Sequence, residues 1–190
     1  MTGELDYMML IGQGVGVLAF CVASMKNFKK KKSDILKLSI VAYAIYIVHY
    51  FMIGAIAGSY TLILALLRDT YMFKRETHHK KHRHRKLYNN PLFFILLFSA
   101  YTTLIILNIH TPVNTLPLFA GVTYLSFEWF TTNKTTLKIA GGFTTLPWVF
   151  FDLISFSIAG FVSDSISLVV CAAGVLKDKK LRRKVVKHNH

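Results

Sequence analysis

Lysine and arginine are concentrated in three short blocks, and long apolar stretches separate these blocks along the chain. The blocks cover residues 26–37, 74–86 and 177–187 and hold nearly all of the 23 basic residues. The chain is otherwise oily, since 53% of its 190 residues are hydrophobic although its formal net charge is +14. A nucleic-acid-binding domain normally spreads its basic residues over a hydrophilic chain. The segregation therefore predicts an integral membrane protein that binds no nucleic acid.

Seven apolar segments approach the length that a helix needs to cross a bilayer, about 17–25 residues. They cover residues 8–25, 35–53, 55–73, 92–109, 115–130, 137–157 and 159–176. Continuous apolar runs suit helices and not the alternating strands of a membrane barrel, so we expect an all-α membrane protein. Acidic residues precede the first segment and lysines follow it, which is the reverse of a cleaved signal peptide. We expect that segment to be retained as a helix.

The connections between these segments alternate in charge. The first, third and fifth connections and the C-terminal tail carry lysine or arginine, whereas the second, fourth and sixth contain neither. Because cytoplasmic loops carry the excess of basic residues, all basic blocks share one side only if the spans number seven. This pattern predicts an outside N-terminus and a cytoplasmic C-terminus.

Two short motifs recur at matching places. Residues 16–17 and 121–122 are both Gly-Val inside the first and fifth segments, and residues 56–58 and 158–160 are both Ile-Ala-Gly at tight turns. Both halves begin outside, so we expect two parallel three-helix bundles related by an axis along the membrane normal. The expected organisation is a first repeat at 1–75, a basic His-rich cytoplasmic loop at 76–91, a linker helix at 92–110, a second repeat at 111–177 and a basic cytoplasmic tail at 178–190.

The first half also carries a family resemblance. Residues 11–13 (Ile-Gly-Gln) and 16–20 (Gly-Val-Leu-Ala-Phe) lie in the first segment, followed by a basic linker, His49, residues 53–55 (Ile-Gly-Ala) and residues 67–68 (Leu-Arg). In these features the chain resembles the YgjV family of bacterial inner-membrane proteins. The resemblance implies a location in the bacterial inner membrane and no particular reaction.

The order of three helices, a linker helix and three helices is similar to the architecture of the SWEET and PQ-loop solute facilitators. Those families typically carry a Pro-Gln pair in the first helix of each bundle. Here the fifth segment has Leu116-Pro117 and the first has Gly12-Gln13 without a proline. This resemblance is one of topology and implies a hinge at Pro117 without a partner in the first half.

Ionisable and polar residues inside spans are candidates for a site, because each costs roughly 2.5–3.5 kcal/mol when inserted as a charge. His49 lies late in the second span, and Asp152 lies at the corresponding place in the sixth, after Pro147. We predict that they meet as a hydrogen-bonded pair and, with Gln13, form a substrate-binding site. Ordinary interhelical contacts remain the alternative for all three residues.

Three other charged residues are interpreted as structural. Arg68 is placed about one turn from the inner interface, where its long side chain reaches the head groups and anchors the helix. Its neighbour Asp69 points about 100° away on a helix, so the two are not expected to pair. Glu128, beside Trp129, suits the interfacial belt.

The loop around His78, His79, His82 and His84 is rich in histidine, yet its lysines and arginines would repel a metal ion. We interpret it as a polybasic segment that attracts anionic lipid head groups and binds no metal. No catalytic or cofactor-binding motif is found in the sequence, so we expect neither an enzyme nor a cofactor.

Two functional hypotheses remain open. In the first, the protein is a facilitator for a small polar solute that passes through the bundle interior. In the second, it is a membrane scaffold or lipid-interacting protein that transports nothing. The first requires a polar cavity between the helices, and the second requires a tightly packed interior. The sequence leaves the number of copies open.

Overall fold

The computed structural model describes residues 2–26, 29, 31–79, 90–131 and 134–188. Seven helices follow one another within this part of the chain, so the predicted all-α fold with seven helices is confirmed. They are α1 (Thr2–Met25), α2 (Lys32–Met52), α3 (Ile56–His79), α4 (Pro91–Leu107), α5 (Pro112–Phe130), α6 (Lys134–Ile154) and α7 (Ile158–His188).

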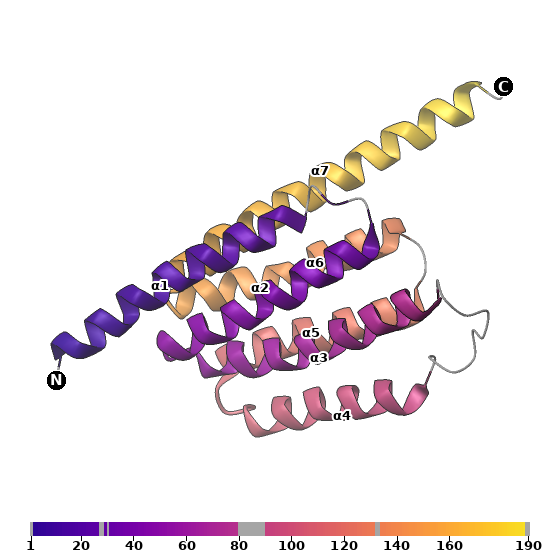
Figure 1. The fold of residues 1–190 in the computed structure, drawn as a ribbon. Coiled ribbons are helices and arrows are strands. Elements are labelled where there is room, and N and C mark those ends of the chain that lie inside the picture. Colours follow the sequence, from indigo (N-terminus) through magenta and orange to yellow (C-terminus); the bar gives the residue numbers. More distant parts are fainter. Residues whose placement is uncertain (1, 27–28, 30, 80–89, 132–133, 189–190) are drawn as a thin grey trace.

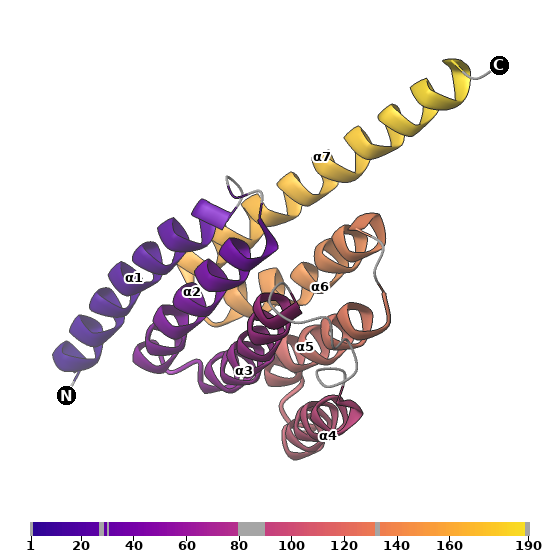
Figure 2. The same cartoon turned by 45° about the vertical axis from the view of Figure 1, so that its right-hand side comes forward.

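Six of the helices close into a ring. Each packs against its neighbours in the order α1, α2, α3, α5, α6, α7, and α7 returns to α1. The helix α4 lies outside this ring against α5 and α3 (Figures 1 and 2). Helices α1, α2 and α3 occupy places in the ring that correspond to those of α5, α6 and α7. The two predicted three-helix bundles thus form the two halves of one ring. The halves contact each other at two places, which we call the α3–α5 seam and the α7–α1 seam.

Short turns join the helices at one end of the ring, which we call the turn end. Figure 1 shows the N-terminus there together with the turns after α2, α4 and α6. The turn after α2 uses Gly54 at φ 74°, a left-handed conformation in which glycine is unstrained. The turn after α6 places Phe156 at φ 53°. Pro112 occupies the first turn of α5, where its missing N–H is no loss.

The opposite end, which we call the basic end, is where α1, α3 and α5 finish and α2, α4 and α6 begin (Figure 1). The first two basic blocks of the sequence adjoin these helix ends, and the third lies in the C-terminal part of α7. The helix α7 does not stop near residue 176 as expected but continues to His188, well past the rest of the bundle. The predicted tail at 178–190 is thus helical as far as residue 188.

The distribution of side chains is the reverse of that in a water-soluble protein. Large apolar residues such as Leu10, Phe143 and Phe150 are exposed on the outside, while Arg68 and Asp152 are buried. In the part of the chain that the structure describes, two helical segments, Tyr7–Met25 and Ser33–Met52, are long and apolar enough to cross a membrane, judged by length and composition. Shorter apolar helical segments lie at Pro91–Leu107, Ile139–Ile154 and Ile158–Ala173. An apolar exterior around a polar interior suits a hydrocarbon solvent.

Candidate functional site

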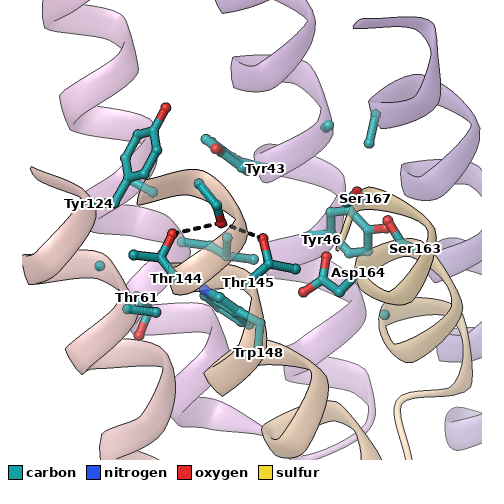
Figure 3. Close-up of a pocket in the computed structure, with 18 of the residues that line it drawn as sticks. Tyr43, Tyr46, Thr61, Tyr124, Thr144, Thr145, Trp148, Ser163, Asp164 and Ser167 are labelled. Atoms are coloured by element: carbon teal, nitrogen blue, oxygen red, sulfur yellow. Dashed lines mark hydrogen bonds between the residues drawn. The ribbon is translucent and has the colours of Figure 1, made fainter. Parts of the chain in front are cut away.

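A cavity of about 300 Å³ lies inside the ring. All seven helices contribute to its wall, because Tyr101 of α4 reaches inward between α3 and α5. The aromatic ring of Tyr101 fits there only beside Gly121, because a Cβ at that position would clash with the Tyr101 ring. The wall is rich in hydroxyl groups and aromatic rings (Figure 3). The polar and aromatic wall residues include Tyr43, Tyr46, Tyr50, Thr61, Tyr124, Thr144, Thr145, Trp148, Ser163 and Ser167.

Aromatic contacts join α2 to α6 across the turn-end part of this cavity. The ring of Tyr50 stacks on Tyr46 with centroids 6.1 Å apart and lies 5.9 Å from both Trp148 and Phe151. Trp148 and Phe151 meet edge to face at 5.9 Å. Such pairs rigidify the wall while leaving π-faces and edges available to a bound molecule.

A buried ion cluster lies at the α3–α5 seam, and two of its members, Arg68 and Tyr124, line the cavity. The guanidinium of Arg68 lies 2.8 Å from the Asp69 carboxylate and 3.2 Å from the Glu128 carboxylate. It also lies over the ring of Tyr124, 4.7 Å from the centroid. Both Arg68 and Asp69 are only 4% exposed. One cation is thus held by two carboxylates from two helices and by an aromatic face.

This cluster corrects three predictions. Arg68 is not an interfacial anchor, and it does pair with its sequence neighbour Asp69. Adjacent Cβ directions on a helix do diverge, but the arginine side chain is long enough to fold back to the neighbouring carboxylate. In a low-dielectric interior an unpaired charge is far more costly than this bent rotamer, so the pair forms. Glu128, assigned to the interfacial belt, takes part in the same buried cluster.

Two charged residues of the wall were missed by the sequence reasoning. Asp164 of α7 and Lys26, directly after α1, both line the cavity. They attract one another electrostatically, yet among the described residues Asp164 makes neither a hydrogen bond nor an ion pair within 4 Å. Asp164 lies inside an apolar span, so the rule that singled out Asp152 also applies to it. Lys26 looked like an ordinary member of the first basic block.

The three predicted site residues lie together at the turn end, and none of them lines the cavity. The side chain of Gln13 donates to the Phe156 carbonyl at 2.7 Å and accepts from the Ala159 N–H at 3.4 Å. His49 Nδ1 lies 2.7 Å from the Gly12 carbonyl, and its Nε2 lies 2.9 Å from the Ser157 hydroxyl. These hydrogen bonds tie α1 and α2 to the turn between α6 and α7.

The predicted pair of His49 and Asp152 is wrong, although both residues are fully buried and close to the same turn. Asp152 instead accepts a 2.6 Å hydrogen bond from the Tyr50 hydroxyl, and His49 is occupied by Gly12 and Ser157. Tyr50, the next residue on α2, reaches the Asp152 carboxylate because a tyrosine side chain is longer than that of histidine. Since Tyr50 also lines the cavity, Asp152 stands one hydrogen bond behind the cavity wall.

Glycines allow this close packing at the turn end. A Cβ at Gly16 would lie 2.7 Å from the Cβ of Ala159 and 2.8 Å from Nδ1 of His49, so α1 can approach α7 only without a side chain there. Gly12 faces Met52 and Ile53 of the α2 end in the same way. The G-x-x-x-G spacing on α1 is therefore used for packing within the bundle.

Within the described part of the chain, no group of three histidine, cysteine or acidic residues could hold a metal ion. The predicted polybasic loop is a separate matter, because residues 80–89, including His82 and His84, lie outside the described residues.

The ring of apolar-faced helices around a polar interior defines a polytopic membrane protein. Residues 10–182 match the Imp-YgjV family of bacterial inner membrane proteins, and the chain belongs to that family. It is 22% identical over 174 residues to the "Inner membrane protein YgjV" of Escherichia coli (strain K12), covering 92% of this chain and 87% of that one. No solved structure matches the chain. The protein is thus a bacterial inner-membrane protein embedded in the lipid bilayer.

Proposed function

We propose that the protein is a facilitator for a small polar solute, which it carries through the interior of the six-helix ring. The observation that supports this proposal is the cavity of about 300 Å³ with its hydroxyl, aromatic and charged wall. A scaffold that served only to hold lipids or partners would gain stability from filling this space, since empty volume in a core is destabilising. The proposal involves no catalytic reaction.

The cavity lies nearer the basic end on the α1 side of the ring. The α1 residues in its wall, from Phe20 to Lys26, all come from the last part of that helix. Towards the turn end, the hydrogen bonds of Gln13 and His49 and the contact of Gly16 with Ala159 close the same seam. With basic residues facing the cytoplasm, the N-terminus is outside and this conformation receives solute from the cytoplasmic side.

The direct test is solute flux into proteoliposomes that contain the purified protein. Thr145 lies on the cavity wall, so Thr145→Trp fills the space and is expected to abolish flux. Thr103 is an exposed threonine on the outer helix α4, and Thr103→Trp serves as the matched control with unchanged flux. If the native, folded protein moves no solute of any tested class, or if Thr145→Trp transports normally, the proposal fails.

A second candidate function rests on a separate observation, the extension of α7 to His188 beyond the bundle. We propose that this basic helix and the basic loops recruit anionic lipids, with about 1 kcal/mol per basic residue near the membrane surface. The full-length protein should then gain thermal stability from anionic over zwitterionic lipid. That gain should shrink with salt and in a chain shortened after residue 176. Equal stability in both lipids would contradict this role.

A further inference from the structure

The charges around the cavity do not balance. Arg68 is held by two carboxylates, Asp69 and Glu128, which leaves one negative charge in that cluster. Lys26 attracts both Asp69 and Asp164 but forms an ion pair within 4 Å with neither, so the three carboxylates Asp69, Glu128 and Asp164 share two cations. Asp164 is thus a carboxylate on the cavity wall that no cation among the described residues pairs with directly. An isolated charge in a membrane interior is costly, and a bound cation would offset that cost.

The surroundings of Asp164 suit an organic cation better than a metal ion. In Figure 3 its carboxylate points into the cavity on the side where Tyr46, Thr145 and Trp148 lie. The faces of tryptophan and tyrosine attract ammonium groups, most strongly when water is excluded. A metal ion would need several oxygen or nitrogen ligands, and no group of three histidine, cysteine or acidic residues that could hold one is found among the described residues.

The volume of the cavity limits the size of the ligand that it can hold. A volume of about 300 Å³ corresponds to roughly ten water molecules at ~30 Å³ each. That is room for a small ammonium compound with a hydroxyl group, and the hydroxyls of Thr144, Thr145 and Ser163 are available to such a group. We propose that the cavity is a binding site for a small organic ammonium ion, with Asp164 as the counter-ion and Trp148 and Tyr46 against its alkyl groups. This inference rests on the proposed function and names the class of its solute.

The test measures equilibrium binding to the purified full-length protein by isothermal titration, independently of transport. Two matched pairs of probes differ only in charge: choline with its neutral analogue 3,3-dimethyl-1-butanol, and ethanolamine with ethylene glycol. We expect at least one ammonium compound to bind about 30-fold more tightly than its neutral partner, equivalent to roughly 2 kcal/mol for a desolvated cation. Asp164→Asn should remove that preference, whereas Asp34→Asn, outside the cavity wall, should leave it intact.

Each outcome decides the inference. Equal binding of charged and neutral partners, or no binding of either ammonium compound to native protein, overturns it. An unchanged preference in a folded Asp164→Asn variant also overturns it. Since the probe pairs act on the native chain, the test stands even if that variant does not fold. A neutral solute that binds and crosses proteoliposomes would leave the facilitator proposal in place while this inference fails.

Discussion

The two seams between the halves of the ring occupy corresponding places but are closed in different ways. At the α3–α5 seam, Arg68 joins Asp69 to Glu128, and Tyr101 of α4 inserts between the two helices. At the α7–α1 seam, the charged residues Asp164 and Lys26 face the cavity without forming an ion pair within 4 Å. That seam is held at its turn end instead. The α3–α5 seam is therefore held by a buried ion cluster, whereas the α7–α1 seam is closely packed at its turn end only.

The two seams have corresponding helices, and they differ because different charged side chains lie at each of them. An arginine can be shared by two carboxylates in a planar, multi-donor arrangement, which a lysine at longer distance cannot reproduce. Helix α4 also packs against α3 and α5, and no eighth helix packs at the corresponding place against α7 and α1 in the described part of the chain. A carrier that opens its cavity by moving one half against the other would be expected to separate at the α7–α1 seam.

The largest expected effect comes from breaking the fixed seam. Arg68→Ala leaves two buried carboxylates without their cation and should lower the free energy of unfolding by about 3–5 kcal/mol. Lys74→Ala, an exposed cation further along α3, is the control and should change it little. Unfolding in a denaturing detergent series measures both. A loss below about 1 kcal/mol for Arg68→Ala would show that the cluster does not hold this seam.

The next effect concerns the turn end of the other seam. His49→Ala removes two buried hydrogen bonds and leaves the Ser157 hydroxyl and the Gly12 carbonyl without that partner. The expected loss is about 2–3 kcal/mol. The adjacent Val48 is half exposed, so Val48→Ala provides a matched control on the outward face of α2. If both variants unfold at the same denaturant concentration, the histidine contributes nothing to closure.

The close packing of α1 against α7 predicts a smaller loss in the free energy of unfolding. Gly16→Val places a side chain against Ala159 and His49 and should cost about 1–3 kcal/mol through overpacking. Gly14 lies on the same helix with nothing within 4 Å of its added Cβ, so Gly14→Val should be neutral or slightly stabilising. Thermal unfolding in detergent distinguishes them. Equal midpoints for the two variants would contradict the close approach of α1 to α7.

The smallest effect on stability is expected at the loose end of the α7–α1 seam. Lys26 is half-buried and makes no ion pair within 4 Å among the described residues. Lys26→Met should therefore change the free energy of unfolding by less than about 1 kcal/mol. A loss as large as that of Arg68→Ala would show that the two seams are equally fixed.

The number and order of helices could be predicted from the sequence, because span length and the alternation of basic connections both follow from bilayer physics. The same rule about charges in spans singled out Asp152, which is buried, and it would also have found Asp164. The partners of these residues could not be predicted. Whether His49 meets Asp152 or Ser157 depends on ångström-scale differences in helix position, and a one-residue shift gives Tyr50 the contact instead. The buried position of Arg68 depends on Glu128, a partner about 60 residues away in the sequence.

We propose that solute reaches the cavity from the basic end while the turn end is shut. Labelling of a single cysteine on the cavity wall tests this access. In a chain with Cys21→Ala and Cys171→Ala, Thr145→Cys reports on the cavity wall and Thr103→Cys on the outer face of α4. A membrane-impermeant thiol reagent is added to either side of sealed vesicles. Labelling of Thr145→Cys from the cytoplasmic side, little from the outside and none of Thr103→Cys is the predicted result. Protection of Thr145→Cys from both sides, in folded protein, would show that the cavity cannot be reached from the basic end.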